Sequence, residues 1–228
     1  MLDQRKKIIL ETVIKEHIKT GQPVGSEILV EKYKLNISPA TVRNEMVELE
    51  KEGFIRQPYT SAGRVPTEEA YQLYLENLSY KKLSKTETNL LESILKNKEE
   101  SDLKQMAKAL AKISDNAVFL AINKNNLYYT GISNLLHQPE FTQSNLIYDI
   151  SKVIDHLDEI IDDIFDEIKN GTQILIGTKN PFGSFCSTIL LKYKLKDNTG
   201  MFGLIGPLRM DYGRNLALIN YLGNLISK

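Results

Sequence analysis

The 228-residue sequence contains a single cysteine, Cys186, and carries no formal net charge, because 29 basic residues are balanced by 29 acidic ones. One cysteine excludes an internal disulfide framework and fits a reducing compartment. No apolar run approaches the roughly 20 residues that a membrane-spanning helix needs, and the N-terminus is charged, unlike a secretory signal. We therefore expect a cytoplasmic protein without a membrane partner, in which any nucleic-acid surface is a local patch.

Signatures of catalysis and cofactor binding are also lacking. The sequence has no P-loop, no Rossmann glycine pattern and no CxxC pair. No nucleophile signature surrounds Cys186, which is expected to be buried in a strand, and His17, His137 and His156 are scattered. Seven carboxylates between positions 155 and 167 follow one face of an expected helix without the spacing of an oxygen cage. We expect no enzyme, no metal and no cofactor.

Two groups near the C-terminus superficially suggest a ligand site. Gly203, Gly206 and Gly213 resemble a phosphate cradle, but their spacing fits no such loop, and we interpret them as serving tight turns. Arg209 and Asp211 would suit a ligand at the start of a helix. A helix cap with a local ion pair explains these two residues equally well.

What the sequence has is the composition of a soluble globular protein, 42% hydrophobic and 25% charged. Its most regular pattern lies in residues 22–66. Ser26 is expected to cap a helix that runs to Tyr33. Ser38 and Pro39 then mark a second helix start, because a serine oxygen satisfies an orphan N–H group and proline is tolerated at the first helical position.

The second of these helices has two different faces. Val42, Met46 and Leu49 recur at spacings of four and three residues, so they share an inward face. The opposite face suits the reading of base edges, because asparagine pairs with adenine, arginine pairs with guanine, and threonine or alanine contacts a thymine methyl group. The residues expected to contact DNA from this helix are Ser38, Ala40, Thr41, Arg43 and Asn44.

A short basic hairpin is expected directly after this helix, with strands at residues 54–57 and 64–66. Its tip is rich in hydroxyl groups and is bracketed by two arginines, which suits contact with phosphates or a minor groove. A solvated hairpin without function would also carry two arginines, but a hairpin that follows a capped helix pair favours a winged helix-turn-helix. The residues expected to contact DNA from the hairpin are Arg56, Tyr59, Thr60, Ser61 and Arg64.

Two more helices complete this first domain. Residues 2–19 form an amphipathic helix whose apolar stripe includes His17, so a packed histidine is favoured over a catalytic or metal-binding one. Thr67 is expected to cap a later helix. The apolar stripe of that helix consists of Tyr71, Tyr74, Leu75 and Leu78. The stripe belongs either to the core of this domain or to a seam between two subunits.

The second half of the chain shows a different pattern. Residues 79–85 are polar and basic without periodicity, as in a linker, and Thr86 and Ser101 are expected to cap the two helices that follow. Short apolar runs then alternate with turns and helices, which predicts an α+β domain. The expected strands are residues 117–122, 127–132, 173–177, 185–195 and 201–205, and the expected helices are residues 155–169 and one capped by Asp211.

Several long phrases resemble one bacterial family. TGQPVGSEILVEKY, SPATVRNEMVELEKEGFI and QPYTSAGRVPTEEAYQLYLENL are similar to the N-terminal domain of HrcA, the heat-inducible transcription repressor family. GISNLLHQPEF and FGLIGPLRMDYGRNLALINYL are similar to its C-terminal half. The resemblance implies a homodimer that binds double-stranded DNA at an inverted-repeat operator (CIRCE) upstream of chaperone genes. It also implies that the chaperonin GroEL helps to keep the repressor active.

Patterns and resemblance together predict an α+β fold: an N-terminal winged helix-turn-helix, then a GAF-like antiparallel sheet with flanking helices. The expected divisions are a DNA-binding domain at 1–78, a linker and connecting helix at 79–100, and a regulatory and dimerisation domain at 101–228. One departure from the family is expected at residues 123–126, NKNN, where an inserted subdomain that takes part in dimerisation is reduced to a turn.

Two other functions remain open at this point. The first is a transcription regulator whose GAF-like domain binds a small molecule, which a ligand-dependent thermal shift would reveal. The second is a protein-interaction module whose basic hairpin contacts a partner protein. A gel shift against an inverted repeat at physiological salt separates the DNA-binding hypotheses from this last one.

Overall fold

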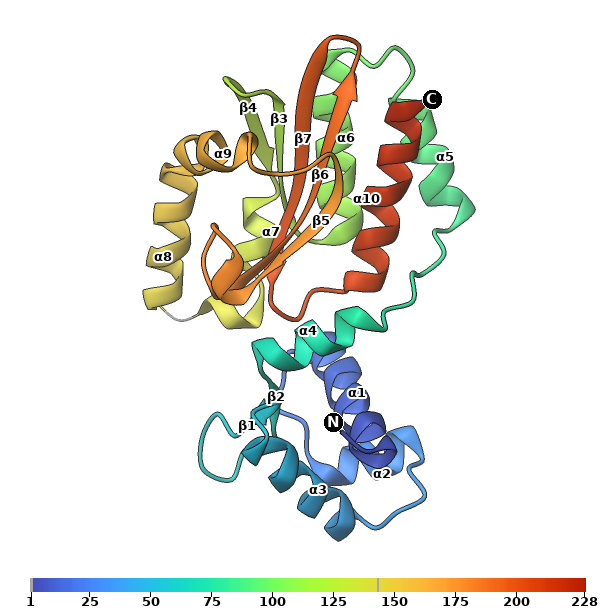
Figure 1. The fold of residues 1–228 in the computed structure, drawn as a ribbon, viewed down its shortest axis with the longest axis vertical. Helices are drawn as coiled ribbons and strands as arrows, with labels where there is room; N and C mark the ends of the chain where they lie inside the picture. The colour runs from blue at the N-terminus through green and yellow to red at the C-terminus, as the bar shows by residue number, and fades with distance from the viewer. Residues whose placement is uncertain (1, 143) are drawn as a thin grey trace. The chain divides into compact units, whose positions relative to one another are not determined.

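The computed structural model describes residues 2–142 and 144–228, and the chain forms two compact units, Met1–Leu78 and Ser79–Lys228 (Figure 1). The first unit consists of helices and a two-stranded hairpin, and the second contains a five-stranded antiparallel sheet flanked by helices. The predicted α+β fold class, with an N-terminal winged helix-turn-helix, is therefore confirmed.

The first unit is built on helices that pack around one apolar core. Its elements are α1 (Gln4–Thr20), α2 (Ser26–Tyr33), α3 (Pro39–Lys51), β1 (Ile55–Arg56), β2 (Val65–Pro66) and α4 (Glu68–Glu76). The side chains at the centre are at most 2% exposed, and they include Leu10, Val13, Leu29, Val42, Leu49, Ile55 and Tyr71. His17 is packed as predicted, because its Nδ1 lies 2.8 Å from the Tyr71 hydroxyl oxygen. Tyr71 thus belongs to the core of this unit.

Side-chain caps fix where most of these helices begin. The Ser38 hydroxyl accepts a hydrogen bond from the Thr41 N–H at 3.1 Å, and the Thr67 hydroxyl accepts one from the Ala70 N–H at 3.4 Å, as predicted. The prediction for α2 is wrong by one residue. Gly25 occupies its N-cap position, and Ser26 is the first helical residue, so no side chain caps this helix.

A buried carboxylate joins α1 to α2. Glu16 is 4% exposed, and its two oxygens accept hydrogen bonds from the Lys32 Nζ at 2.6 Å and from the Tyr33 hydroxyl at 2.8 Å. The Lys32 hydrogen bond, more than any other contact, holds the pKa of Glu16 below its usual range, although burial opposes this. Burial, followed by the Glu16 hydrogen bond, raises the pKa of Tyr33 to about 12.

Glu16→Gln is expected to destabilise the first unit by about 1–2 kcal/mol at pH 7, since Lys32 is half exposed and solvent screens its charge. A carboxyl group with a depressed folded-state pKa contributes stability above its unfolded pKa of about 4.3. This contribution disappears as the pH falls through the folded-state pKa. Amide hydrogen exchange of α1 and α2 from pH 7 to pH 3 measures the difference.

Glu11→Gln is the matched control, because Glu11 lies on the same helix and its carboxylate is 51% exposed beside Lys15. Its effect should stay within about 0.5 kcal/mol at every pH. Equal exchange rates in the Glu16→Gln and Glu11→Gln variants at pH 7 would show that the buried carboxylate does not stabilise the unit.

The second unit is a twisted antiparallel sheet in the strand order β4-β3-β7-β6-β5. Its elements are α5 (Lys85–Ile94), α6 (Glu100–Ser114), β3 (Ala117–Asn123), β4 (Asn126–Thr130), α7 (Ile132–Leu136), η1 (Pro139–Thr142), α8 (Ser144–Asp155), α9 (Leu157–Phe165), β5 (Gly171–Ile176), η2 (Gly177–Lys179), β6 (Cys186–Leu195), β7 (Asn198–Pro207) and α10 (Tyr212–Ser227). Each predicted strand has a counterpart within a few residues. The hairpin expected around NKNN is the β3–β4 hairpin.

Helices cover both faces of this sheet (Figure 1). α10 packs on β6 and α6 packs on β3 on one face, with α5 against α6. On the other face, side chains from α7, α8 and α9 bury a cluster with Phe119, Phe182 and Leu190 at its centre, each 0% exposed. α5 is thus part of this unit, although the sequence placed it in a linker segment.

Three local expectations for the second unit are wrong. Ser84, not Thr86, caps α5, in a capping box with Glu87. Ser101 lies inside α6, which begins at Glu100. The helix expected at residues 155–169 is the shorter α9, which ends at Phe165, and the sequence analysis did not anticipate α8, which precedes it.

The glycine-rich segment contains no tight turns at Gly203 or Gly206, because both residues lie inside β7. A Cβ atom on Gly203 would lie 2.1 Å from the Phe119 ring, and one on Gly206 would lie 2.0 Å from the Asn116 side-chain oxygen. These glycines leave room for neighbouring side chains. Gly213 lies in the first turn of α10.

Arg209 and Asp211 have structural partners. The Arg209 guanidinium pairs with Glu140 and donates a hydrogen bond to the Gln138 side-chain oxygen at 2.8 Å. Asp211 caps α10 by accepting a hydrogen bond from the Arg214 N–H at 3.1 Å. The interpretation of Asp211 as a cap is confirmed, whereas the ion pair of Arg209 reaches Glu140 from a distant part of the chain.

Candidate nucleic-acid interface

The first half of α3 presents an exposed, partly polar face. Val42, Met46 and Leu49 are 0%, 4% and 0% exposed, so the opposite side of the helix must point outward. Among the residues predicted to read DNA, Ser38, Ala40, Arg43 and Asn44 are exposed and Thr41 is partly buried. The Thr41 hydroxyl oxygen lies 2.9 Å from that of Ser38, so the cap also orients this side chain.

Arg43 and Asn44 have free polar groups. Neither side chain has a hydrogen bond or an ion pair to any residue that the structure describes. A free guanidinium and a free amide on one helical surface can donate to and accept from an external partner without breaking an internal contact.

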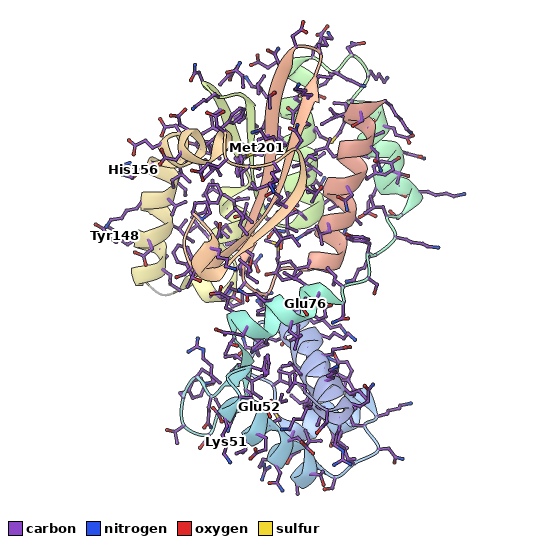
Figure 2. All side chains as sticks on the ribbon, in the orientation of Figure 1. Lys51, Glu52, Glu76, Tyr148, His156 and Met201 are labelled. Atoms are coloured by element: carbon purple, nitrogen blue, oxygen red, sulfur yellow. The ribbon has the colours of Figure 1, made fainter. Side chains whose placement is uncertain are left out.

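The second half of α3 is acidic, and cations neutralise its carboxylates. Glu45 pairs with Arg5 at 3.3 Å and Glu48 pairs with Lys51 at 2.8 Å. Glu52, which Figure 2 labels beside Lys51 at the end of α3, pairs with Lys6 of α1. These pairs reduce the repulsion that an anionic ligand would otherwise meet at this end of the helix.

The hairpin is anchored on the segment that precedes α2. The Arg64 N–H donates to the Val24 carbonyl and the Val24 N–H donates to the Arg64 carbonyl, each at 2.9 Å. A Cβ atom on Gly63 would lie 2.5 Å from the Val24 carbonyl carbon, so only glycine allows this approach. An isolated β-bridge between Val24 and Arg64 therefore ties the hairpin to this segment, which the sequence analysis did not anticipate.

Glu50 holds the hairpin to α3. One of its carboxylate oxygens accepts a hydrogen bond from the Gln57 N–H at 2.8 Å, and the other accepts one from the Arg64 Nε at 2.9 Å. The Arg64 side chain is only 16% exposed. Arg64 is thus engaged within the unit, whereas the sequence analysis had placed it at the DNA.

The tip of the hairpin remains exposed. Tyr59 is 67% exposed, and Arg56, Thr60 and Ser61 are exposed as well. Arg56 has no ion pair with any described residue. A hydrogen bond of 3.0 Å from the Ala62 N–H to the Tyr59 carbonyl closes the turn.

Glu50 and Gln57 are the residues that sequence reasoning missed at this site. Glu50 follows Leu49 in an acidic run, and nothing local distinguishes it from Glu48 or Glu52. Its importance comes from a contact 14 residues away along the chain. The only available signal was its position on the helix, on the side facing the hairpin.

The His, Cys, Asp and Glu side chains are the possible metal ligands among the described residues. No group of three His, Cys, Asp or Glu side chains in the described ranges is placed to hold a metal ion. Cys186 is 1% exposed, and burial raises the pKa of its thiol, which keeps it protonated. No helix found among the described residues is long and apolar enough to cross a membrane.

Comparisons with known proteins agree with this geometry. The family model described as "HrcA protein C terminal domain" matches residues 37–216. The "Heat-inducible transcription repressor HrcA" of Thermobifida fusca is 34% identical over 188 residues, which are 78% of this chain and 54% of that relative. This chain therefore spans about half the length of that relative.

A second relative aligns over its whole length. The "Heat-inducible transcription repressor HrcA" of Carboxydothermus hydrogenoformans is 25% identical over 335 aligned positions, which cover 100% of this chain and 98% of the relative. Since this chain has 228 residues, 335 minus 228 leaves 107 aligned positions without a residue of this chain. This agrees with the expectation that an internal segment of the family is missing here.

One solved structure shares the fold. A protein described as "Crystal structure of a hypothetical protein at 2.2 A resolution" matches with a TM-score of 0.79 at 18% identity, covering 100% of this chain and 98% of the other. At this identity the match supports the fold alone. From the family model and the full-length relatives, we conclude that this chain belongs to the HrcA family of heat-inducible transcription repressors.

Proposed function

We propose that this protein represses heat-shock genes by binding an inverted-repeat operator of the CIRCE type as a homodimer. The observation that supports this most directly is the surface of α3. Arg43 and Asn44 are exposed and free of internal partners beside a hairpin whose tip is also exposed. The physical requirement for base reading is a helix with free donors and acceptors on one side and an anchored apolar side on the other.

The proposed assignments divide the site by the part of DNA contacted. Ala40, Thr41, Arg43 and Asn44 contact base edges in the major groove. The Ser38 end of α3 and the hairpin residues Arg56, Tyr59, Thr60 and Ser61 contact the sugar-phosphate backbone or the minor groove. In this assignment Arg64 holds the hairpin in position through Glu50.

A dimer follows from the symmetry of the target. Each chain has one recognition helix and reads one half-site, so two chains related by a twofold axis read an inverted repeat. The two α3 helices must then lie roughly 34 Å apart, or a multiple of this distance. We further propose that GroEL maintains the binding-competent form and that heat relieves repression by diverting it.

A gel shift at physiological salt tests the proposed function. The full chain is expected to bind the inverted repeat at least about 1,000-fold more tightly than a scrambled duplex, as specific repressors do. Added GroEL is expected to raise the fraction of protein that shifts the operator. Equal affinity for both duplexes would contradict the proposal.

A further inference from the structure

Val47 is an apolar side chain of α3 that lies outside the core. It is 37% exposed, whereas Met46 beside it in the chain is 4% exposed. Because each residue of an α-helix turns by about 100°, Val47 lies about 40° from Arg43 and about 60° from Asn44 around the helix axis. All three side chains are exposed. Val47 therefore continues the outward face of α3 by one turn beyond the two free polar side chains.

The carboxylates on either side of Val47 are paired with cations. Glu45 pairs with Arg5 of α1 at 3.3 Å, and Glu48 pairs with Lys51 at 2.8 Å. The hydrogen bond from Lys51 holds the pKa of Glu48 below its usual range, so this pair stays ionised at neutral pH. The two pairs together carry no net charge. This turn of the helix can therefore approach the phosphates that line a groove at low electrostatic cost.

Exposure of a single aliphatic side chain does not by itself indicate a contact, because much of any protein surface is apolar. Ile8 on α1 is 45% exposed in the same unit and lies outside the proposed DNA surface. What distinguishes Val47 is its position in line with Arg43 and Asn44. Ile8 is therefore a suitable control for Val47.

The chemistry of base edges decides what an aliphatic side chain in this position can recognise. In the major groove the bases present hydrogen-bond donors and acceptors, and thymine also presents its C5 methyl group. A valine side chain has no donor and no acceptor, so the thymine methyl is the base-edge group with which it buries apolar surface. The three residues from Asn44 to Val47 rise by about 4.5 Å, and one base-pair step is about 3.4 Å.

We propose that Val47 contacts the C5 methyl group of a thymine in the operator, within about two base pairs of the base pair that Asn44 contacts. This inference rests on the proposed function, because it adds a specificity-determining residue to the same helix. It extends the base-contacting surface of α3 into the half of the helix whose carboxylates are neutralised.

Replacement of single thymines by deoxyuridine tests this contact, because deoxyuridine lacks only the C5 methyl group. At one position of each half-site, the wild type should bind the modified operator about fourfold more weakly, which corresponds to the burial of one methyl group. Val47→Ala should bind the unmodified operator about fourfold more weakly. At the contacted position, deoxyuridine should then cost the variant less than a further twofold, because the two changes remove the same contact.

Three controls separate this contact from a structural effect. Val47→Ala should melt at the same or a higher temperature, since alanine has the higher helix propensity, and its affinity for a scrambled duplex should stay within about twofold. Val47→Thr keeps a methyl group and should retain sensitivity to deoxyuridine at the same position. Ile8→Ala should change the affinity for operator and scrambled duplex by less than about twofold.

The possible results distinguish this inference from the proposed function. If the wild type prefers the inverted repeat but no deoxyuridine position is coupled to Val47→Ala, the contact is overturned and the proposed function stands. If Val47→Ala weakens operator and scrambled duplex equally and lowers the apparent mass in gel filtration, Val47 is a subunit contact and the assignment is overturned. If the wild type shows no preference for the inverted repeat, the proposed function fails and the thymine contact fails with it.

Discussion

Asn44→Ala is expected to lower the affinity for the inverted repeat by roughly 5- to 150-fold, the range that corresponds to the 1–3 kcal/mol of a bidentate base contact. Its side chain is exposed near the start of α3 and has no partner among the described residues, so removing it leaves the fold intact. Affinity for scrambled duplex should stay within about twofold, because nonspecific binding depends on phosphates.

Competition gel shifts with base-substituted half-sites measure this effect. The variant should tolerate substitution at one base pair that the wild type requires, and that base pair identifies the contact. Asn36→Ala is the matched control, since Asn36 is an exposed amide residue outside α3. Equal losses of Asn44→Ala on operator and scrambled duplex would contradict a base-reading role.

Arg64→Ala is expected to weaken binding to operator and scrambled DNA alike, by about 10- to 100-fold. The Arg64 side chain is 16% exposed and is bonded to Glu50, which also accepts the Gln57 N–H. Removing the guanidinium leaves the Glu50 carboxylate without its cation beside the proposed DNA surface and removes one of the two contacts that Glu50 makes with the hairpin. Both consequences act on every duplex if, as proposed, the hairpin contacts the backbone rather than particular bases.

Glu50→Gln distinguishes a positioning role from direct contact. If Arg64 holds the hairpin, Glu50→Gln should also weaken both complexes, and the double variant should be no worse than Arg64→Ala alone, because the two residues act as one unit. If Arg64 contacts phosphate directly, Glu50→Gln should free it and strengthen binding.

Arg56→Ala is the comparison for a direct phosphate contact from the hairpin. Arg56 is exposed and has no ion pair with a described residue. Its loss should therefore reduce the slope of log affinity against log salt concentration by roughly 0.9, both in the wild-type background and in the Glu50→Gln background. Titration of binding against salt for all four variants supplies the slopes.

Local patterns in the sequence predicted much of the interface. Ser38 and Pro39 marked the start of α3, and the spacing of Val42, Met46 and Leu49 fixed which side is buried. A cap acts within three residues and a helical face repeats every 3.6 residues, so both can be recognised without the rest of the chain.

The wrong predictions of helix caps and of glycine roles concern positions where more than one residue or more than one role fits the local sequence. Ser84, Thr86 and Ser26 are all possible caps by residue type, and only the backbone path selects Ser84 for α5 and Gly25 for α2. Gly203 looked like a turn residue because glycine permits turns. Its reason lies in Phe119, which is 84 positions earlier in the chain but adjacent across the sheet.

The sequence by itself determined the class of fold, the helix α3 with its outer face, and the family. Only the tertiary structure decided that Arg64 pairs with Glu50, that Val24 forms a β-bridge with Arg64, and that the start of α2 has no side-chain cap and lines a cavity. The physical reason is distance along the chain. Caps and periodicity are interactions between near neighbours, whereas an ion pair, a close backbone approach and a cavity arise where separate segments meet.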